Sequence, residues 1–202
     1  MNTIGKLCGF VFISCLLLSL MSARKRAADM EGLQDTAGNP SGVSEGRTML
    51  FDMSNTAGWR VYKDKNVAVE LSILQAKAGR ALQVTYNMGA GMWLGIKKKA
   101  PIDLSKYAGV SFKCRDEGAI NTVEIKVEDS DGSVFGTDVV FESGIKDLKE
   151  VEIPFSSLEY WWGGDETLDL KKATLHFTVS KKDDEDEGGY GMLTIGQIEL
   201  YK

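Results

Sequence analysis

The chain has 202 residues, of which 43% are hydrophobic and 26% are charged, and its formal net charge is -5. This balance excludes an intrinsically disordered chain, because moderate charge and ample apolar content are enough to fill a core. It also argues against nucleic acid as a partner, since nucleic-acid-binding domains carry a basic surplus.

The first 23 residues predict a secretory signal peptide. Lys6 is followed by an apolar run over 7–21, and the small residues Ser22 and Ala23 come next. That run is shorter than the roughly 20 residues that a bilayer-spanning helix needs, and its flanks are those of a cleavable signal. We therefore expect a secreted, periplasmic or cell-surface protein.

Two other interpretations of the N-terminus stay open. Arg24-Lys25-Arg26 follows the apolar run directly and would hold an uncleaved segment in the membrane. Ser14 before Cys15 resembles a lipid-attachment site, although apolar residues continue beyond it. Contact with a membrane is expected only through such an uncleaved or lipidated N-terminus.

Residues 24–47 predict a flexible linker, because glycine, serine and proline recur there and large apolar side chains are scarce. Residues 48–202 form the predicted folded domain, which keeps 25 of the 29 acidic residues. A domain of this size buries enough surface for a full hydrophobic core.

The cysteine and histidine content limits the chemistry. Cys8 and Cys15 fall in the signal peptide, so Cys114 is the single cysteine of the domain. An intramolecular disulfide and a cysteine-based metal site are therefore excluded in the mature chain. Cys114 alternates with apolar residues and is expected to be buried. Nothing in the sequence links it to His176, the single histidine, as a catalytic pair.

From residue 48 onward the dominant period is two, which is typical of half-buried antiparallel strands because successive side chains point to opposite faces. The clearest strands are predicted at 80–87, 110–115, 122–128 and 173–179. Further strands are predicted at 48–53, 67–73, 92–97, 134–142, 148–153 and 192–201, and single helical turns at 103–107 and 155–158. Many short strands with turn residues between them predict an all-β fold, an antiparallel β-sandwich of the jelly-roll type.

Several segments of the domain form an ordered set. They are Gly58-Trp59 after Phe51-Asp52, 79–86 with 92–96, 102–112, 127–132, 149–156, and 168–177 with 195–200. This set resembles the galactose-binding-like β-sandwich of carbohydrate-binding modules, especially families eleven and thirty, and it covers nearly all of 48–202. The resemblance implies non-catalytic binding of a polysaccharide or oligosaccharide, with no cofactor required.

The resemblance also implies a structural Ca²⁺ between the first and last strands. Asp52 matches the first-strand ligand, but Gly196-Gln197 stand where the family tends to have acidic residues. Asp129 and Asp131 offer a second arrangement for Ca²⁺, or a turn in which each carboxylate bonds its own backbone. The charged stretch at 181–190 predicts a hairpin loop that is most simply a solvated tip, with cation binding as the alternative.

Sugar recognition needs flat aromatic rings and polar side chains of fixed geometry on an exposed face. The candidate ligand-binding residues are those that face away from the predicted core, together with an aromatic cluster. They are Gln83, Thr85, Trp93, Glu124, Lys126, His176, Tyr160, Trp161 and Trp162, and Asn87, Lys97, Glu128, Thr174 and Thr178 share their faces.

Two of these features point most directly to a ligand. Trp93 is expected to face outward because Met92, Leu94 and Ile96 would occupy the core side, although packing beneath a loop is an alternative. Residues 160–162 precede Gly163-Gly164 and predict a loop that presents aromatic rings at a rim. The alternative is that one or two of those rings close the end of the sandwich.

Three functional hypotheses follow. The first is a non-catalytic carbohydrate-binding protein, and the second is a structural or adhesive envelope protein that uses the same sandwich to bind a protein partner. The third is a small glycan hydrolase that uses Glu124 with Glu128. Those two glutamates lie on one flat strand face, which implies no cleft and no burial to raise a carboxyl pKa.

Overall fold

The protein is described by a computed structural model over residues 46–76, 79–139, 148–182 and 187–202. The predicted signal peptide and the predicted linker up to residue 45 lie outside the described residues. Within the described part, twelve strands form two antiparallel sheets, as the period of two predicts. Among the same residues, no helix has the length and apolar content needed to cross a membrane.

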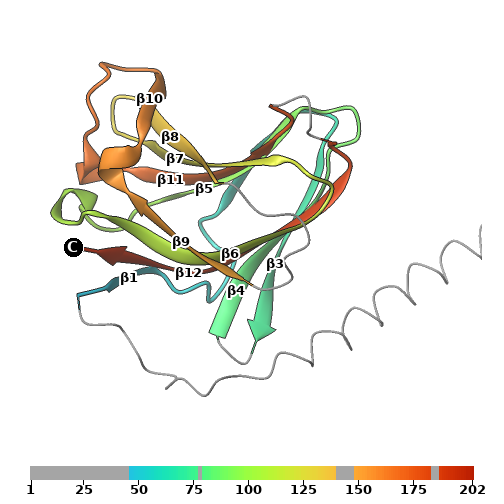
Figure 1. The fold of residues 1–202 in the computed structure, drawn as a ribbon, viewed down its shortest axis with the longest axis horizontal. Coiled ribbons are helices and arrows are strands. Elements are labelled where there is room, and N and C mark those ends of the chain that lie inside the picture. Colours follow the sequence, from blue (N-terminus) through green and yellow to red (C-terminus); the bar gives the residue numbers. More distant parts are fainter. Residues whose placement is uncertain (1–45, 77–78, 140–147, 183–186) are drawn as a thin grey trace, which may run out of the picture. The chain divides into compact units, whose positions relative to one another are not determined.

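The first sheet, called sheet A, has the strand order β3-β4-β12-β6-β9, and β1 pairs with β12. Its strands are β1 (Thr48–Phe51), β3 (Ala68–Ala76), β4 (Gly79–Asn87), β6 (Gly109–Gly118), β9 (Lys149–Pro154) and β12 (Tyr190–Tyr201). In Figure 1, the strands β1, β12, β6 and β9 form the lower layer.

The second sheet, called sheet B, has the order β10-β8-β7-β11-β5-β2. Its strands are β2 (Arg60–Lys63), β5 (Trp93–Lys99), β7 (Thr122–Glu128), β8 (Val134–Val139), β10 (Glu159–Trp162) and β11 (Thr174–Ser180). β10 and β2 are therefore its two edges, and the sheet forms the upper layer in Figure 1.

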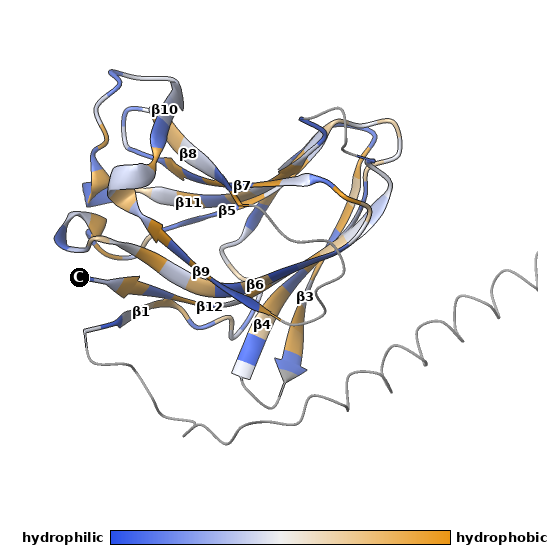
Figure 2. Cartoon of the chain, viewed as in Figure 1, coloured by the Kyte–Doolittle hydropathy of each residue, from blue (hydrophilic) through white to orange (hydrophobic). Residues whose placement is uncertain are grey.

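The core lies between the two sheets, and the strands that face it alternate between hydrophobic and hydrophilic residues (Figure 2). Buried side chains come from both sheets, and include Leu82, Val84, Tyr86, Leu94, Ile96, Val110, Phe112, Val123, Ile125, Val127, Leu175, Phe177, Val179, Leu193 and Ile195. Cys114 belongs to this core, as predicted, and burial raises the pKa of its thiol. Burial on this scale is the main source of stability in such a sandwich.

Each predicted strand corresponds to an observed one, and the predicted helical turns appear as η2 (Leu104–Lys106) and η3 (Phe155–Ser157). Residues 140–142 of the predicted strand 134–142 lie outside the described residues. Three elements were not predicted, namely β2, β10 and the turn η4 (Leu170–Lys172). Each has three or four residues, which is too short for a periodic pattern to stand out.

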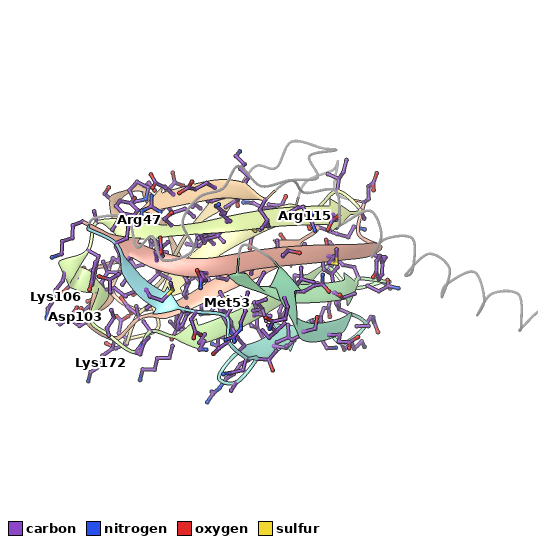
Figure 3. All side chains as sticks on the ribbon, turned by 90° about the horizontal axis from the view of Figure 1, so that it is seen from below. Arg47, Met53, Asp103, Lys106, Arg115 and Lys172 are labelled. Carbon is purple, nitrogen blue, oxygen red and sulfur yellow. The ribbon has the colours of Figure 1, made fainter. Side chains whose placement is uncertain are left out.

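Arg47, at the end of the predicted linker, is fixed to the outer face of sheet A (Figure 3). Its Nη1 donates to Ser111 Oγ at 2.7 Å, and its Nη2 lies 2.5 Å from Glu152 Oε1. Glu150 and Glu199 also lie within ion-pair distance. The chain therefore joins the domain on the sheet that lies opposite sheet B.

Candidate functional site

A groove of about 400 Å³ lies on the outer face of sheet B. It is bordered by side chains from the strands β2, β5, β7, β10 and β11 and from residues that directly flank β5 and β11. They are Tyr62, Met92, Trp93, Glu124, Lys126, Trp162, Thr178, Ser180, Lys181 and Lys182. Aromatic rings stand at both sides of this groove, and charged and hydroxyl-bearing side chains lie between them.

The side near β2 and β5 is formed by Tyr62 and Trp93. Their ring centroids are 5.7 Å apart. Trp93 is 39% exposed while Leu94 and Ile96 are buried, so its predicted outward orientation agrees with the structure. Met92 was expected on the core side, but it is 50% exposed and borders the groove. It precedes β5, and the alternation of that strand does not extend to it.

The opposite side is formed by Trp161 and Trp162 of β10. Their ring centroids are 5.9 Å apart, and Lys126 Nζ lies 5.1 Å and 5.2 Å from the two centroids. Such cation–π contacts hold the rings over the sheet. The prediction of a loop at 160–162 was wrong, because these residues belong to the edge strand β10, which pairs with β8.

Tyr160 points away from the two tryptophans. Its ring packs edge-on against the buried ring of Phe135 at 5.6 Å, and its hydroxyl donates to the Gly163 carbonyl oxygen at 2.8 Å. The pairing of β10 with β8 is irregular between Tyr160 and Trp162. This bulge lets two successive tryptophans share the outer face of the sheet.

The floor of the groove consists of paired charges. Lys126 Nζ lies 2.5 Å from Glu124 Oε2, and Ser180 Oγ donates to Glu124 Oε1 at 3.2 Å. Both members of the Lys126–Glu124 pair are buried. Lys182 pairs with Asp138 at 2.8 Å at one side. Buried charges that are paired in this way keep fixed positions and present a defined polar surface.

His176 connects the floor to Tyr62. The Tyr62 hydroxyl lies 3.0 Å from His176 Nδ1 and 2.8 Å from Thr178 Oγ1. On the other side of the imidazole, Nε2 lies 2.9 Å from Glu128 Oε2, at an angle outside hydrogen-bond geometry. Glu128 also accepts a bond of 2.9 Å from Lys97 Nζ. A continuous chain of polar contacts therefore orients the Tyr62 ring.

The charge state of this chain follows from burial. Burial lowers the pKa of His176 to about 4, and the ammonium groups of Lys97 and Lys126 disfavour its protonation further, against the attraction of Glu128. Burial works to raise the pKa of Glu128, but the bond from Lys97 and the contact with His176 outweigh it and leave that pKa below its usual value. Burial also raises the pKa of Tyr62 to about 12. At neutral pH the imidazole is neutral and the phenol keeps its proton.

Comparison with known proteins identifies the family. The model of the carbohydrate binding domain of family 11 matches residues 35–201, which is most of the chain. The chain belongs to carbohydrate-binding domain family 11. The family 11 domain is a non-catalytic carbohydrate-binding module, as the resemblance to family eleven implied. The resemblance to family thirty stays a prediction.

Individual relatives support the same family 11 fold. The family 11 module from Clostridium thermocellum in complex with a β-1,3-1,4-mixed-linked tetrasaccharide has a TM-score of 0.62 and 24% identity, over 78% of this chain and 96% of that one. The family 11 module of a cellulosomal cellulase from the same organism has a TM-score of 0.61 and 24% identity, over 78% and 95%. Endoglucanase H of Acetivibrio thermocellus is 27% identical over 148 residues, and the match spans 65% of this chain but 16% of that relative.

The structure separates the predicted site residues of this family 11 domain. Trp93, Glu124, Lys126, His176, Trp161 and Trp162 share the outer face of sheet B, as do Lys97, Glu128 and Thr178. Gln83 and Thr85 lie on the other sheet, in β4, where Gln83 contacts Ser72. They therefore cannot contribute to the groove, and Tyr160 turns its ring away from it. Asn87 lies at the end of β4.

Sequence reasoning missed Tyr62, the residue that reaches furthest across the groove. Its strand β2 has four residues, all at least partly exposed, so no alternation reveals it. The available signal was Gly95 in the middle of β5, because a strand-interior glycine often marks the close approach of another group.

The carboxylates of the two glutamates in the hydrolase hypothesis both have partners within the protein. Glu124 bonds Lys126 and Ser180, and Glu128 bonds Lys97 and lies against His176. The expected absence of a cleft and of burial is wrong for Glu124, which is buried and borders the groove, but its carboxylate is held by Lys126. The pKa of Glu128 lies below its usual value, whereas the general acid of glycoside hydrolysis needs a raised pKa. Their arrangement agrees with the non-catalytic nature of family 11 domains.

The predicted calcium sites were compared with the described residues. Among those residues, no three His, Cys, Asp or Glu side chains come together to hold a metal ion. Asp52 Oδ1 accepts from the Ser54 backbone N–H at 3.0 Å. Asp129 and Asp131 accept five backbone N–H bonds between them, as expected of the turn interpretation. A structural Ca²⁺ at either place stays a prediction.

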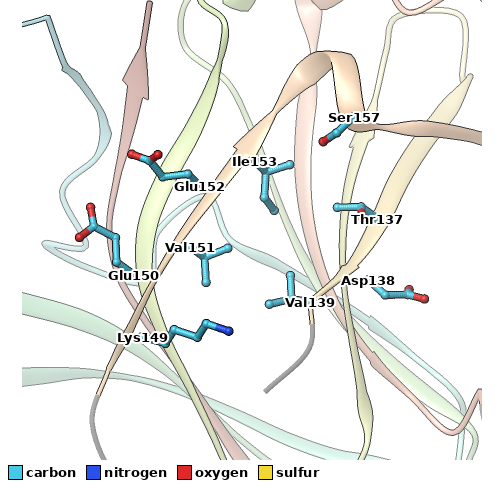
Figure 4. A pocket seen from close by; sticks show the side chains of 9 residues that line it. All are labelled: Thr137, Asp138, Val139, Lys149, Glu150, Val151, Glu152, Ile153 and Ser157. Carbon is cyan, nitrogen blue, oxygen red and sulfur yellow. The ribbon is translucent and has the colours of Figure 1, made fainter. Parts of the chain in front are cut away.

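A second cavity of about 330 Å³ lies between β8 and β9, where Val139, Val151 and Ile153 point toward one another (Figure 4). Glu150 and Glu152 point away from it on the other side of β9. No aromatic ring borders this cavity, whereas Tyr62, Trp93 and Trp162 line the groove and Trp161 packs beside Trp162. The groove is therefore the candidate site of the family 11 domain.

Proposed function

We propose that the groove on sheet B binds a neutral polysaccharide chain and that the protein carries out no reaction on it. The observation that supports this most strongly is the pair of aromatic sides, Tyr62 with Trp93 and Trp161 with Trp162, on either side of a polar floor. Aromatic rings cover the apolar faces of sugar rings, and fixed polar groups meet their hydroxyls.

The proposed ligand is an internal stretch of several sugar units. The Tyr62 ring lies on β5 and the Trp161 ring on β8, and β11 and β7 lie between those strands. Three strand spacings amount to about 14 Å, which exceeds a single pyranose ring. A chain that touches both sides therefore crosses the strands of sheet B.

The charges of the floor favour a neutral ligand. Lys126 pairs with Glu124, Lys182 with Asp138, and Lys97 with Glu128. A cation and an anion match in each of these three pairs, and Lys181 also borders the groove. An anionic glycan would have to compete with these carboxylates at the cost of unpaired charge.

The first ligand to test is β-1,3-1,4-mixed-linked glucan, because a family 11 relative was seen with a tetrasaccharide of that linkage. In native affinity gels, we expect this glucan to retard the purified protein. A polyuronate of similar length is the matched control and is expected to leave its mobility unchanged. Absence of retardation across a panel of neutral polysaccharides would favour the alternative of a protein partner.

We also propose that the protein acts outside the cytoplasm, on the strength of the predicted signal peptide at 1–23. Expression of the full chain with a C-terminal tag should yield a mature form that begins after Ala23 and lies in the periplasm, medium or cell surface. N-terminal sequencing distinguishes this from an uncleaved anchor, and labelling with a radioactive fatty acid tests lipidation at Cys15.

No metal ion is expected to be required for binding, because the polar groups of the floor already neutralise one another. Retardation by the glucan should be the same in EDTA and in millimolar Ca²⁺. A loss of retardation in EDTA that Ca²⁺ restores would contradict this part of the proposal.

A further inference from the structure

Two glycines lie beneath the aromatic rings of the groove, one near each edge of sheet B. Gly95 is in the middle of β5, and Gly136 is in the middle of β8. Glycine in a strand interior weakens the strand, because it adds backbone freedom and offers no side chain to pack. Its presence at these two positions therefore calls for a local reason.

Gly95 lies under the ring of Tyr62. Tyr62 and Thr178 are its cross-strand neighbours on β2 and β11. A Cβ on Gly95 would come within 2.5 Å of the Tyr62 hydroxyl and 2.7 Å of its Cε1. The phenol ring therefore lies directly on the backbone of β5 at Gly95, and its hydroxyl contacts Thr178 and His176 of β11.

Gly136 has the same relation to Trp161 at the opposite edge. Its cross-strand neighbours are Glu159 on β10 and Lys126 on β7. A Cβ there would come within 2.9 Å of Cη2 and 3.0 Å of Cζ2 of the indole. The Trp161 ring thus crosses β8 and meets the ammonium group of Lys126 beyond it. Both edges use the same arrangement, an edge aromatic lying over a glycine of the next strand.

We propose that Gly95 and Gly136 are positioning residues of the groove, whose missing side chains let Tyr62 and Trp161 lie flat and so set the spacing and depth for a glycan chain. Neither glycine needs to touch the ligand. Alanine at either position would lift the ring above it, since real Cβ atoms do not approach other atoms so closely. For Tyr62, lifting the ring also breaks its contacts with His176 and Thr178.

This inference rests on the proposed function, so the experiment separates the two. Native affinity gels with mixed-linked glucan are run on the full chain as wild type, Gly95→Ala and Gly136→Ala. Gly196→Ala is the matched control, because Gly196 lies within β12 of sheet A and its added Cβ would meet Lys113 at no less than 3.3 Å. If the wild type is not retarded, the proposed function fails and the inference with it. If the wild type is retarded, we expect each groove variant to lose about tenfold in affinity and Gly196→Ala to keep it.

A double-mutant cycle shows whether each glycine acts through its ring. Gly95→Ala is expected to lower the thermal unfolding temperature and the affinity, and to do neither in a Tyr62→Ala background, where the clash is gone. Gly136→Ala with Trp161→Ala forms the second cycle. If Gly95→Ala alone does not fold, recovery of folding in the double variant supports the inference. Wild-type affinity in both groove variants, or effects that simply add to those of Tyr62→Ala and Trp161→Ala, would overturn it.

Discussion

At the scale of single residues, exposure and ring orientation decide which aromatic side chains are available to a ligand in the groove. Trp162 is 51% exposed beside the groove, and Trp93 faces it from the other side. Replacing either ring with alanine should reduce affinity for the glucan by about tenfold or more, because few residues carry most of a binding energy. Affinity gels at several glucan concentrations measure the change.

The matched control for these variants is Tyr160→Phe. Tyr160 adjoins the two tryptophans in sequence, but its ring packs on Phe135 and its hydroxyl bonds Gly163. We expect the phenylalanine variant to bind like the wild type. Equal losses in Tyr160→Phe and Trp162→Ala would mean that β10 contributes through its folding and that its individual rings do not matter.

The buried carboxyl group of Asp116 should make the stability of the fold depend on pH. Its carboxyl accepts a bond of 3.4 Å from the Tyr86 hydroxyl, and burial raises its pKa to about 7. The unfolded chain releases this proton near pH 3.9. The folded protein therefore binds more protons between these values, and the free energy of unfolding should fall by roughly 4 kcal/mol as the pH rises from about 4 to 7.

Asp116→Asn should remove this loss while keeping an oxygen for Tyr86. Urea denaturation at pH 4.5 and pH 8 measures the difference between the variant and the wild type. His176 contributes the opposite slope, because its lowered folded-state pKa makes stability fall as the pH drops from about 6.5 toward 4. Since both proteins contain His176, that contribution cancels in the comparison. An unchanged pH profile in the variant would contradict the assignment to Asp116.

Residue orientation was predictable from the sequence only in part. The alternation of Trp93 with Leu94 and Ile96 tells outside from inside, and the structure agrees. The same alternation places Gln83 and Thr85 outside as well, but it carries no information on which of two sheets a strand joins. That choice depends on long-range pairing, which a local pattern does not contain.

At the scale of elements, the turn between β7 and β8 holds the segment that follows Trp162. Asp131 Oδ2 accepts from the Asp165 N–H at 2.9 Å, and its Oδ1 accepts from the Ser133 N–H at 2.8 Å. A side-chain hydrogen bond with Asp129, together with these two backbone bonds, holds the pKa of Asp131 below its usual range. Burial raises the pKa of Asp129.

Asp131→Ala should therefore loosen residues 163–165 and weaken glucan binding several-fold, with a smaller effect in Asp131→Asn, which keeps one acceptor oxygen. Titration of both variants with glucan, followed by tryptophan fluorescence, measures the loss. An alanine variant that binds like the wild type would show that the turn does not fix Trp162.

On sheet A, Arg47 links three strands through its guanidinium group. Its guanidinium joins Ser111 of β6 to carboxylates of β9 and β12. Because the carboxylates are largely exposed, we expect Arg47→Ala to cost about 1 kcal/mol of unfolding free energy. The loss should shrink in 1 M NaCl, where exposed charges are screened. Urea denaturation at low and high salt tests this, and a loss that does not depend on salt would point to packing instead.

The short edge strands mark the limit of prediction for elements. β4, β6, β7 and β11 have clear alternation because each places a row of apolar side chains in the core. β2 and β10 are four-residue strands at the sheet edges, and their neighbours decide their conformation more than their own sequence. They supply Tyr62 and Trp162, two of the three aromatic residues that line the groove, so the elements at the candidate site were the least predictable.

At the scale of the whole molecule, the two sheets divide the roles. Sheet B carries the groove, and sheet A receives Arg47 where the chain enters the domain. The fold was predictable because strand spacing and order are visible in the sequence. The groove was not, because it depends on which strands are neighbours in sheet B.

The central claim is that the groove of sheet B, with rings at both sides, is where a neutral glucan binds. Nuclear magnetic resonance of the four indole N–H groups during titration with a β-1,3-1,4-mixed-linked tetrasaccharide tests it most directly. We predict that the signals of Trp93 and Trp162 shift with one common concentration dependence, and that the signal of Trp59, buried in the core, stays in place. Trp93 and Trp162 signals that stay in place while the backbone amide signals of Gln83 and Thr85 shift in the same spectra would contradict the claim.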